Sequence, residues 1–173
     1  MANTTGKKIK DVAIIGGCAS LIYLTIGDIS YRLSLSRGGL NSKLITDMVA
    51  KSAAKKPKNE YKEKLDSMID DGADWFMHQD TEKIIIEKKH RQSLYADLIR
   101  PDKPSNVYII CIHGYTSSPA NMGIYAKKYH ELGYNVLLPS LRGHGDSEQD
   151  FITMGWNDRL DVICLLYTSP SPR

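Results

Sequence analysis

The strongest hydrophobic signal in the chain is a pair of short apolar runs separated by a helical pattern. Val107–Ile112 contains apolar and aromatic residues without alternation, which is typical of a strand buried on both faces of a parallel sheet. Val136–Leu138 is a second apolar run of the same kind, and Pro139 predicts its end. We therefore expect two neighbouring strands within this part of the chain.

The segment between these runs has the pattern of one amphipathic helix. Ser118 is a candidate N-cap, Pro119 suits the first helical position, and Gly133 suits the position just beyond the last turn. Apolar residues recur between them at helical spacing on one predicted face: Met122, Tyr125, Ala126, Tyr129 and Leu132. Strand, helix and strand together predict one βαβ unit with a right-handed crossover.

Further elements are predicted on both sides of this unit. Lys83–Glu87 and Leu94–Ile99 indicate a pair of strands, with a polar turn over His90–Ser93. Phe151–Ile163 indicates the beginning of another helix, because Trp156, Leu160 and Ile163 are helically spaced. The overall pattern predicts a mixed α/β fold.

The pattern of residues 41–71 predicts one or two amphipathic helices, with a basic linker interrupted by proline over Lys51–Lys58. Such helices suit contact with an anionic membrane surface, and a solvated helix face is the alternative. We expect the second helix to end at Asp70–Gly72, and Trp75-Phe76 to insert into the core. The two predicted apolar faces are Leu44, Ile45, Met48 and Val49, and then Tyr61, Leu65, Met68 and Ile69.

The N-terminal segment contains an uncharged run, Val12–Gly27, that follows Lys7, Lys8 and Lys10. The run is shorter than the roughly 20 residues that a spanning helix needs, and no clear cleavage site follows it. We interpret it as an uncleaved membrane anchor with the N-terminus inside and the rest exported. The alternative is a buried N-terminal helix of a soluble protein. Ile15–Cys18 resembles a lipoprotein box, but the apolar run before Cys18 is too short for one.

Composition narrows the function classes. The chain has 173 residues and a net charge of +3, enough length for one domain with a core and too little charge to indicate a nucleic-acid partner. The glycine-rich stretch Arg142–Ser147 lacks the third glycine and the following helix start of a dinucleotide-binding loop. We therefore predict no nucleic-acid partner and no phosphate cradle at this stretch.

Three short motifs carry a family resemblance. His113-Gly114-Tyr115-Thr116 follows one predicted strand, Arg142–Ser147 follows the next, and Leu132–Val136 lies between them. Together they resemble the α/β-hydrolases, in particular the serine aminopeptidase-like, monoacylglycerol lipase-like and cinnamoyl esterase-like branch, over Thr81–Ile163. The resemblance implies an antiparallel opening pair followed by a parallel βαβ unit. It also implies ester or small-amide hydrolysis through an acyl-enzyme, with no metal or organic cofactor.

The resemblance also assigns roles within the two loops. It makes the backbone N–H of Tyr115 an oxyanion-hole donor, with Gly114 allowing the chain to turn. His113 is then a structural imidazole that braces this loop, since its place in the chain disfavours the role of catalytic base. Tyr115 also suits the acyl pocket, and Thr116 and His144 are expected to line the site.

The resemblance implies a catalytic serine that this sequence lacks. A nucleophile elbow has the form Gly-x-Ser-x-Gly, and the nearest match, Gly145–Gln149, lacks the final glycine. In the family the elbow follows the helix whose pattern this chain abandons at Ile163, and the acid and histidine come later. None of the five histidines can be assigned as the triad base: His78, His90, His113, His130 and His144.

The last ten residues, CLLYTSPSPR, replace a helical pattern by a Pro- and Ser-rich tail. Read back through the genetic code, they match one frame of a transposon-type sequencing adapter, so we interpret 164–173 as an assembly artefact; a genuine disordered C-terminus is the alternative. The predicted organisation is an anchor over 1–35, juxtamembrane helices over 36–79 and the N-terminal half of a hydrolase domain over 80–163.

Three functional hypotheses follow. The first is a serine hydrolase whose N-terminal part is present and inactive by itself. The second is a GDSL-type esterase that uses Ser147, because Gly145-Asp146-Ser147 also begins that signature. The third is a membrane-anchored, non-catalytic scaffold with a hydrolase-like fold.

Overall fold

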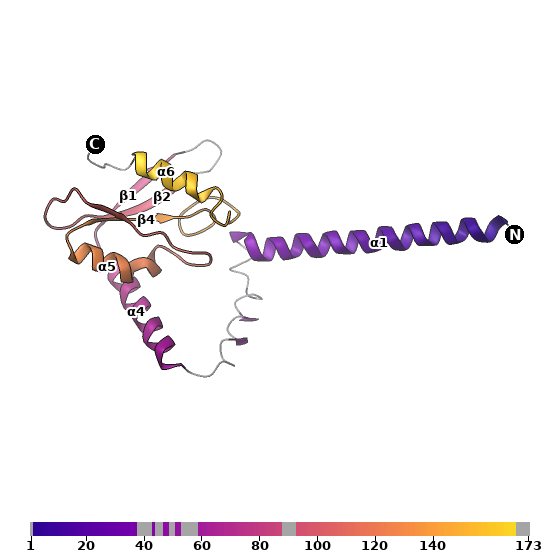
Figure 1. Cartoon of the computed structure of the whole chain (residues 1–173), viewed down its shortest axis with the longest axis horizontal. Helices are drawn as coiled ribbons and strands as arrows, with labels where there is room; N and C mark the ends of the chain where they lie inside the picture. Colours follow the sequence, from indigo (N-terminus) through magenta and orange to yellow (C-terminus); the bar gives the residue numbers. More distant parts are fainter. Residues whose placement is uncertain are drawn as a thin grey trace.

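A computed structural model describes residues 2–37, 43, 47–48, 51–52, 59–87 and 93–168 of the chain. Figure 1 shows a mixed α/β body from which one long helix extends. The elements in chain order are α1 (Ala2–Leu35), α4 (Glu60–Met77), β1 (Thr81–Ile86), β2 (Leu94–Ile99), β3 (Tyr108–Ile110), the 3₁₀ turn η1 (Ala120–Met122), α5 (Gly123–Glu131), β4 (Asn135–Ser140) and α6 (Asp158–Thr168).

The strands form one sheet in the order β1-β2-β4-β3. The β1–β2 and β2–β4 pairs are antiparallel, whereas β3 and β4 are parallel and are joined through α5. The predicted opening pair and the predicted βαβ unit are thus confirmed as elements.

Both faces of the sheet are covered by helices. α4 and α5 lie on one face and α6 lies on the other (Figure 1). On the first face Phe76 and Ala126 pack with a cluster from the strands: Ile99, Cys111, Val136 and Leu138. On the second face Leu165 packs with Ala96, Leu98 and Leu137. Val136, Leu137 and Leu138 therefore alternate between two cores, as successive residues of a strand must.

The prediction that Val107–Ile112 is a strand buried on both faces is wrong. The sheet order places β3 at an edge, so one side of this strand has no partner strand among the described residues. Tyr108, Ile109 and Ile110 are half-buried, and Val107 and Ile112 are 45% and 46% exposed. The local pattern predicted a strand, but its place in the sheet decided its burial.

Pro139 lies within β4 and does not end it. The Asn135 N–H donates to the Val107 carbonyl, and the Cys111 N–H donates to the Leu137 carbonyl. Alternate residues of β4 therefore bond to β3, and residue 139 is next in this series. β3 has already ended there, so the missing N–H of Pro139 costs no ladder bond, and its other side still pairs with Ala96 of β2.

The large apolar residues predicted to form the buried face of α5 are mostly exposed. Tyr125 is 55% exposed and Leu132 is 64% exposed. The predicted face is confirmed at Ala126, which is fully buried, and at Met122, which packs against the core. Small residues face inward because α4 crosses α5 at backbone contact. The predicted stop at Gly133 is confirmed, since this residue has φ +81° just after the helix.

The crossing of α4 and α5 leaves no room for side chains. A Cβ at Gly123 would lie 2.0 Å from the Gly72 carbonyl oxygen, and one at Gly72 would lie 2.3 Å from the Ile124 nitrogen. The prediction that α4 ends at Gly72 is therefore wrong, because glycine here serves close packing and the helix continues to Met77. The predicted insertion of Trp75-Phe76 into the core is confirmed.

α1 is exposed along most of the part whose side chains are described, and Leu33 and Leu35 near its C-terminal end are half-buried. Its large apolar residues are between 49% and 79% exposed: Ile14, Leu21, Ile22, Tyr23, Leu24, Ile26, Ile29 and Tyr31. No helix in the described part of the chain combines the length and the apolar character needed to cross a membrane.

α6 continues past Ile163 and includes the first five residues of the predicted artefact, Cys164–Thr168. Leu165 is 2% exposed, because its position on the helix faces the sheet. The origin of the tail stays a prediction. Several predicted features lie outside the described residues: Leu44, Ile45 and Val49, the linker over 53–58, the turn over 88–92, and residues 169–173.

Candidate active site

Two loops that leave the carboxyl ends of β3 and β4 meet around one cavity. The cavity has a volume of about 620 Å³ and lies between these loops and α6. His113, Gly114, Tyr115 and His144 all line it, while Thr116 is not among its lining residues. Much of the remaining wall is apolar, from Ile112, Leu141, Ile152, Met154, Val162 and Ile163. Ligands in α/β sheets characteristically bind at this end of the strands.

His113 is buried and bonded at both ring nitrogens. Its Nε2 accepts a hydrogen bond from the Leu141 N–H at 3.1 Å, so Nδ1 carries the proton and donates to the Gly114 carbonyl at 3.0 Å. The ring thus joins the β3 loop to the β4 loop. Its edge also contacts the His144 ring, with centroids 4.9 Å apart. Burial lowers the pKa of His113 below its ordinary value of 6.5, and the charge of a protonated His144 would lower it further.

This lowered pKa predicts a loss of stability in acid. Between pH 6.5 and the lower pKa of the folded state, the unfolded chain binds a proton that the folded chain does not, so the free energy of unfolding falls as pH falls. The slope from this one group is at most about 1.4 kcal/mol per pH unit. We expect His113→Gln to flatten this part of the stability profile, measured by urea unfolding between pH 7.5 and 5.

The matched control is His78→Gln, which removes an exposed histidine at the end of α4. Its profile should keep the acid-side slope of the unaltered chain. An equal flattening in both variants would show that the slope does not come from the buried imidazole.

The backbone turn after His113 differs from the sequence-based prediction. Gly114–Ser117 is a tight turn in which the Ser117 N–H donates to the Gly114 carbonyl at 3.2 Å. Gly114 is not in the left-handed region; Thr116 is, with φ 58°. A β-branched residue there costs on the order of 1–3 kcal/mol, and such strain is concentrated at functional sites. Nothing in the residue type of Thr116 indicated this conformation.

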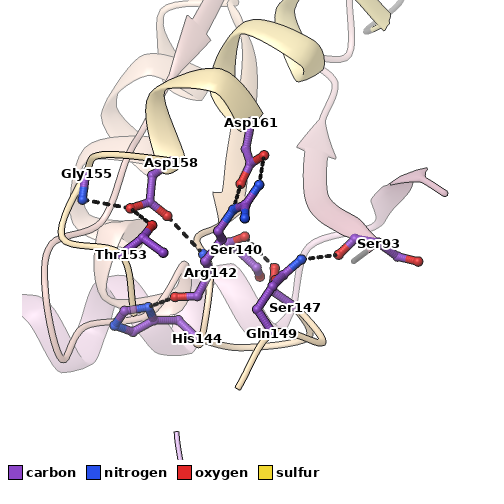
Figure 2. A network of polar contacts seen from close by, with 10 residues as sticks. All are labelled: Ser93, Ser140, Arg142, His144, Ser147, Gln149, Thr153, Gly155, Asp158 and Asp161. Carbon is purple, nitrogen blue, oxygen red and sulfur yellow. Dashed lines mark hydrogen bonds and ion pairs between the residues drawn. The ribbon is translucent and has the colours of Figure 1, made fainter. Parts of the chain in front are cut away.

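The second loop is held by two carboxylates of α6 (Figure 2). Arg142 makes a two-pronged ion pair with Asp161, and these side chains are only 15% and 4% exposed. Asp158 accepts hydrogen bonds from the Arg142 N–H at 3.2 Å, the Thr153 hydroxyl at 2.9 Å and the Gly155 N–H at 2.7 Å. The sequence predicted a helix beginning within Phe151–Ile163 but did not indicate the partners of Asp158 and Asp161.

Ser147 is enclosed within this loop. It is fully buried, and its hydroxyl donates to the Ser140 carbonyl at 2.6 Å. A nucleophilic serine needs access to substrate and a base that accepts its proton, whereas this proton goes to a backbone carbonyl. Gly145, with φ +51°, allows the close approach to Ser140, because a Cβ there would lie 2.8 Å from Ser140 Oγ. This geometry argues against the GDSL-type hypothesis.

His144 presents a different ring environment. Its Nδ1 lies 2.9 Å from the Arg142 carbonyl and donates to it, and its Nε2 is buried without a hydrogen-bond partner among the described residues. His144 is 8% exposed, and as a residue it lines the cavity. Within the described ranges, no cluster of three or more His, Cys, Asp or Glu side chains suits a metal ion.

Comparison with known proteins gives limited similarities. No family model matches the chain. Over 52 residues the chain is 36% identical to a thermostable monoacylglycerol lipase from Bacillus sp. strain H-257. These residues make up 30% of this chain and 21% of the lipase. An esterase structure from Pyrococcus furiosus is 27% identical, with a TM-score of 0.46, covering 56% of this chain and 39% of that one.

The chain thus spans well under half of either relative. The lipase similarity supports a hydrolase of the α/β type at a coarse level.

Proposed function

We propose that this chain is the N-terminal part of a serine hydrolase of the α/β-hydrolase type, which cleaves a carboxylic ester or a small amide through an acyl-enzyme. The observation that carries the proposal is the apolar cavity of about 620 Å³ bounded by the His113–Tyr115 loop and by His144. An apolar pocket with a few inward polar groups at the carboxyl ends of the strands is the form that small-molecule sites take.

In this proposal the backbone N–H of Tyr115 is one donor of the oxyanion hole. The tight turn over Gly114–Ser117 and the left-handed Thr116 hold the peptide beside the cavity. A donor aimed at the developing oxyanion contributes about 3–4 kcal/mol to transition-state stabilisation in other hydrolases. His113 supports this loop through its two hydrogen bonds. Because both ring nitrogens are engaged in these bonds, the imidazole does not act as the triad base.

The nucleophile, acid and base are proposed to lie beyond Ile163 in the natural gene. Among the described residues β3 is an edge strand, beside which a further strand could pair, and no Gly-x-Ser-x-Gly pentapeptide occurs in the 173 residues. No metal or organic cofactor is part of the proposed mechanism. The chemistry needs a proton-accepting histidine, a serine and an oxyanion hole.

A serine-reactive fluorophosphonate probe tests this assignment. We expect no labelling of the 173-residue chain and no turnover of a short-chain nitrophenyl ester. Enzymes that lack only the triad keep a rate roughly 10³–10⁴-fold above that in water, and this residual rate depends on a complete oxyanion hole and binding site. With one oxyanion donor and no triad, the chain should keep little of it. A chain continued through the natural gene beyond Ile163 is expected to hydrolyse the ester and to carry the label on a serine in the added part.

Two outcomes would contradict the proposal. Label on Ser147, mapped by peptide mass spectrometry, would restore the GDSL-type hypothesis despite its burial. An extended chain that folds, as judged by circular dichroism, but neither turns over ester nor takes the label would favour the non-catalytic scaffold.

We also propose that α1 contacts a lipid bilayer, with the domain exported. The support is the row of exposed apolar side chains along the helix, which water solvates poorly. The full chain is expected to float with lipid vesicles in a density gradient, and Leu21→Glu with Leu24→Glu should reduce the floating fraction at least tenfold, since each charge opposes burial in lipid. The matched control, Tyr125→Glu in α5 with Leu132→Glu just after it, changes two exposed positions and should float like the unaltered chain. Equal flotation of all three proteins would count against contact through α1.

A further inference from the structure

The C-terminal end of α1 is bonded to both loops that line the cavity. A helix leaves its last backbone carbonyls without partners inside the helix, and here the domain supplies them. The Tyr115 hydroxyl donates to the Ser34 carbonyl, and the Ile152 N–H donates to the Leu35 carbonyl at 2.8 Å. One donor comes from the β3 loop and the other from the β4 loop.

Arg37 adds a second set of bonds just beyond the helix. Its guanidinium donates to the Ser147 carbonyl at 2.6 Å and also to the Gly145 carbonyl, so its two nitrogens hold the β4 loop from outside. Its backbone N–H donates to the Asp150 carbonyl at 2.9 Å. A guanidinium with several fixed donors suits this two-carbonyl geometry better than an ammonium would.

Two further contacts lie at the same place. Ser36 and Phe151 form an antiparallel bridge, and the Tyr31 and Phe151 rings pack with centroids 5.6 Å apart. The segment Tyr31–Arg37 therefore bonds to the loops through its side chains and its backbone alike. These contacts attach it to the loops of the cavity.

We propose that Tyr31–Arg37 is a positioning element of the site, which we call the α1 clasp, and that Arg37 and the Tyr115 side chain are its positioning residues. Only the catalytic effect of the clasp rests on the proposed function. That effect arises because Tyr115 carries both the proposed oxyanion N–H and the hydroxyl that bonds to α1. Displacement of the helix end then displaces the donor. Part of the oxyanion loop is thus set by a segment about 80 residues earlier in the chain.

Hydrogen exchange measured by mass spectrometry on the full 173-residue chain in mild detergent tests the clasp. We expect Arg37→Ala to raise exchange of the amides in 112–117 and 143–152 about tenfold or more, and Tyr115→Phe to raise exchange in 112–117 about threefold to tenfold, in line with the net strength of the bonds removed. Amides of β2 and β4 should exchange as before in both variants, which separates loosened loops from general destabilisation.

Arg32→Ala is the matched control, because Arg32 lies in the same segment but its side chain pairs with Asp28 on the helix surface and not with the loops. It should leave exchange in both loops unchanged. Loops that exchange at the original rate in Arg37→Ala and Tyr115→Phe would overturn the clasp, as would an equal rise in Arg32→Ala.

The kinetic consequence is measured in the extended chain. Since the clasp orients an oxyanion donor, Arg37→Ala should lower kcat about tenfold or more with little change in KM. A change confined to KM would overturn the positioning role. An extended chain without esterase activity would refute the proposed function, and the exchange experiment would still decide whether the clasp orders the loops.

Discussion

Replacing Gly123 with alanine is expected to lower the free energy of unfolding by about 3 kcal/mol, because the new methyl group has no space to enter. Its Cβ would lie 2.0 Å from the Gly72 carbonyl oxygen and 3.1 Å from the Ala73 nitrogen. These are backbone atoms of another helix, so no side-chain rotation relieves the overlap. α4 and α5 must separate, which withdraws Phe76 from the core. Urea unfolding followed by tryptophan fluorescence measures the loss.

Gly114→Ala is the matched control for this substitution. A Cβ at Gly114 meets no atom within 4 Å, and its φ is not in the left-handed region, so stability should change by less than about 0.5 kcal/mol. If Gly123→Ala unfolds at the same urea concentration as the unaltered chain, α4 does not cross α5 at these two glycines.

Replacing Asp161 with asparagine is expected to cost about 3–5 kcal/mol of stability. The substitution leaves the Arg142 guanidinium with only 15% of its side chain exposed and without its charged partner. The ion pair raises the pKa of Arg142, and a guanidinium stays protonated even without such a partner, so the arginine cannot release its proton to relieve the cost. Loss of the pair also frees the β4 loop from α6, which should appear as faster hydrogen exchange around residues 142–147.

Two variants test this explanation. Arg142→Met combined with Asp161→Leu removes both charges and should recover much of the lost stability, because a buried ion pair is often no better than apolar packing. Glu131→Gln breaks an exposed pair, Lys128–Glu131 at 3.1 Å, and should cost less than about 1 kcal/mol. A double variant no more stable than Asp161→Asn would indicate that packing, rather than an unpaired charge, accounts for the loss.

The sequence predicted elements more reliably than it predicted their burial. Leu94–Ile99 has the same bounds in the sequence prediction and in β2, and Gly133 follows α5 as expected. These features depend on residues adjacent in the chain. The burial of Val107–Ile112 depends instead on which strands flank it, and a position at the sheet edge leaves the strand half-buried.

Helix faces were misread for a related reason. Large apolar residues at helical spacing predicted that Tyr125 and Leu132 face the core, yet both are exposed. The crossing of α4 over α5 needs small residues, so Gly123 and Ala126 occupy the interface. Hydrophobicity identifies a favourable side for burial, but the distance between two backbones decides which side chains fit.

The features of the candidate site also fall into those that the sequence indicated and those that it did not. By itself, the sequence determined that His113–Thr116 and Arg142–Ser147 follow successive strands, that they resemble loops of α/β-hydrolases and that no nucleophile elbow is present. Such features are carried by residue type and short spacing, which local chemistry dictates. The sequence did not indicate the left-handed Thr116, the burial of Ser147 or the pairing of Arg142 with Asp161.

Tertiary structure decided these features because each depends on groups that are distant in the chain. The bonds from Tyr115 and Arg37 to α1 and the β4 loop join residues 81 to 110 positions apart. No local pattern marks a carbonyl left free at a helix end or a loop oxygen within reach of a guanidinium. Their partners become fixed only when the sheet brings the carboxyl ends of β3 and β4 together beside the end of α1.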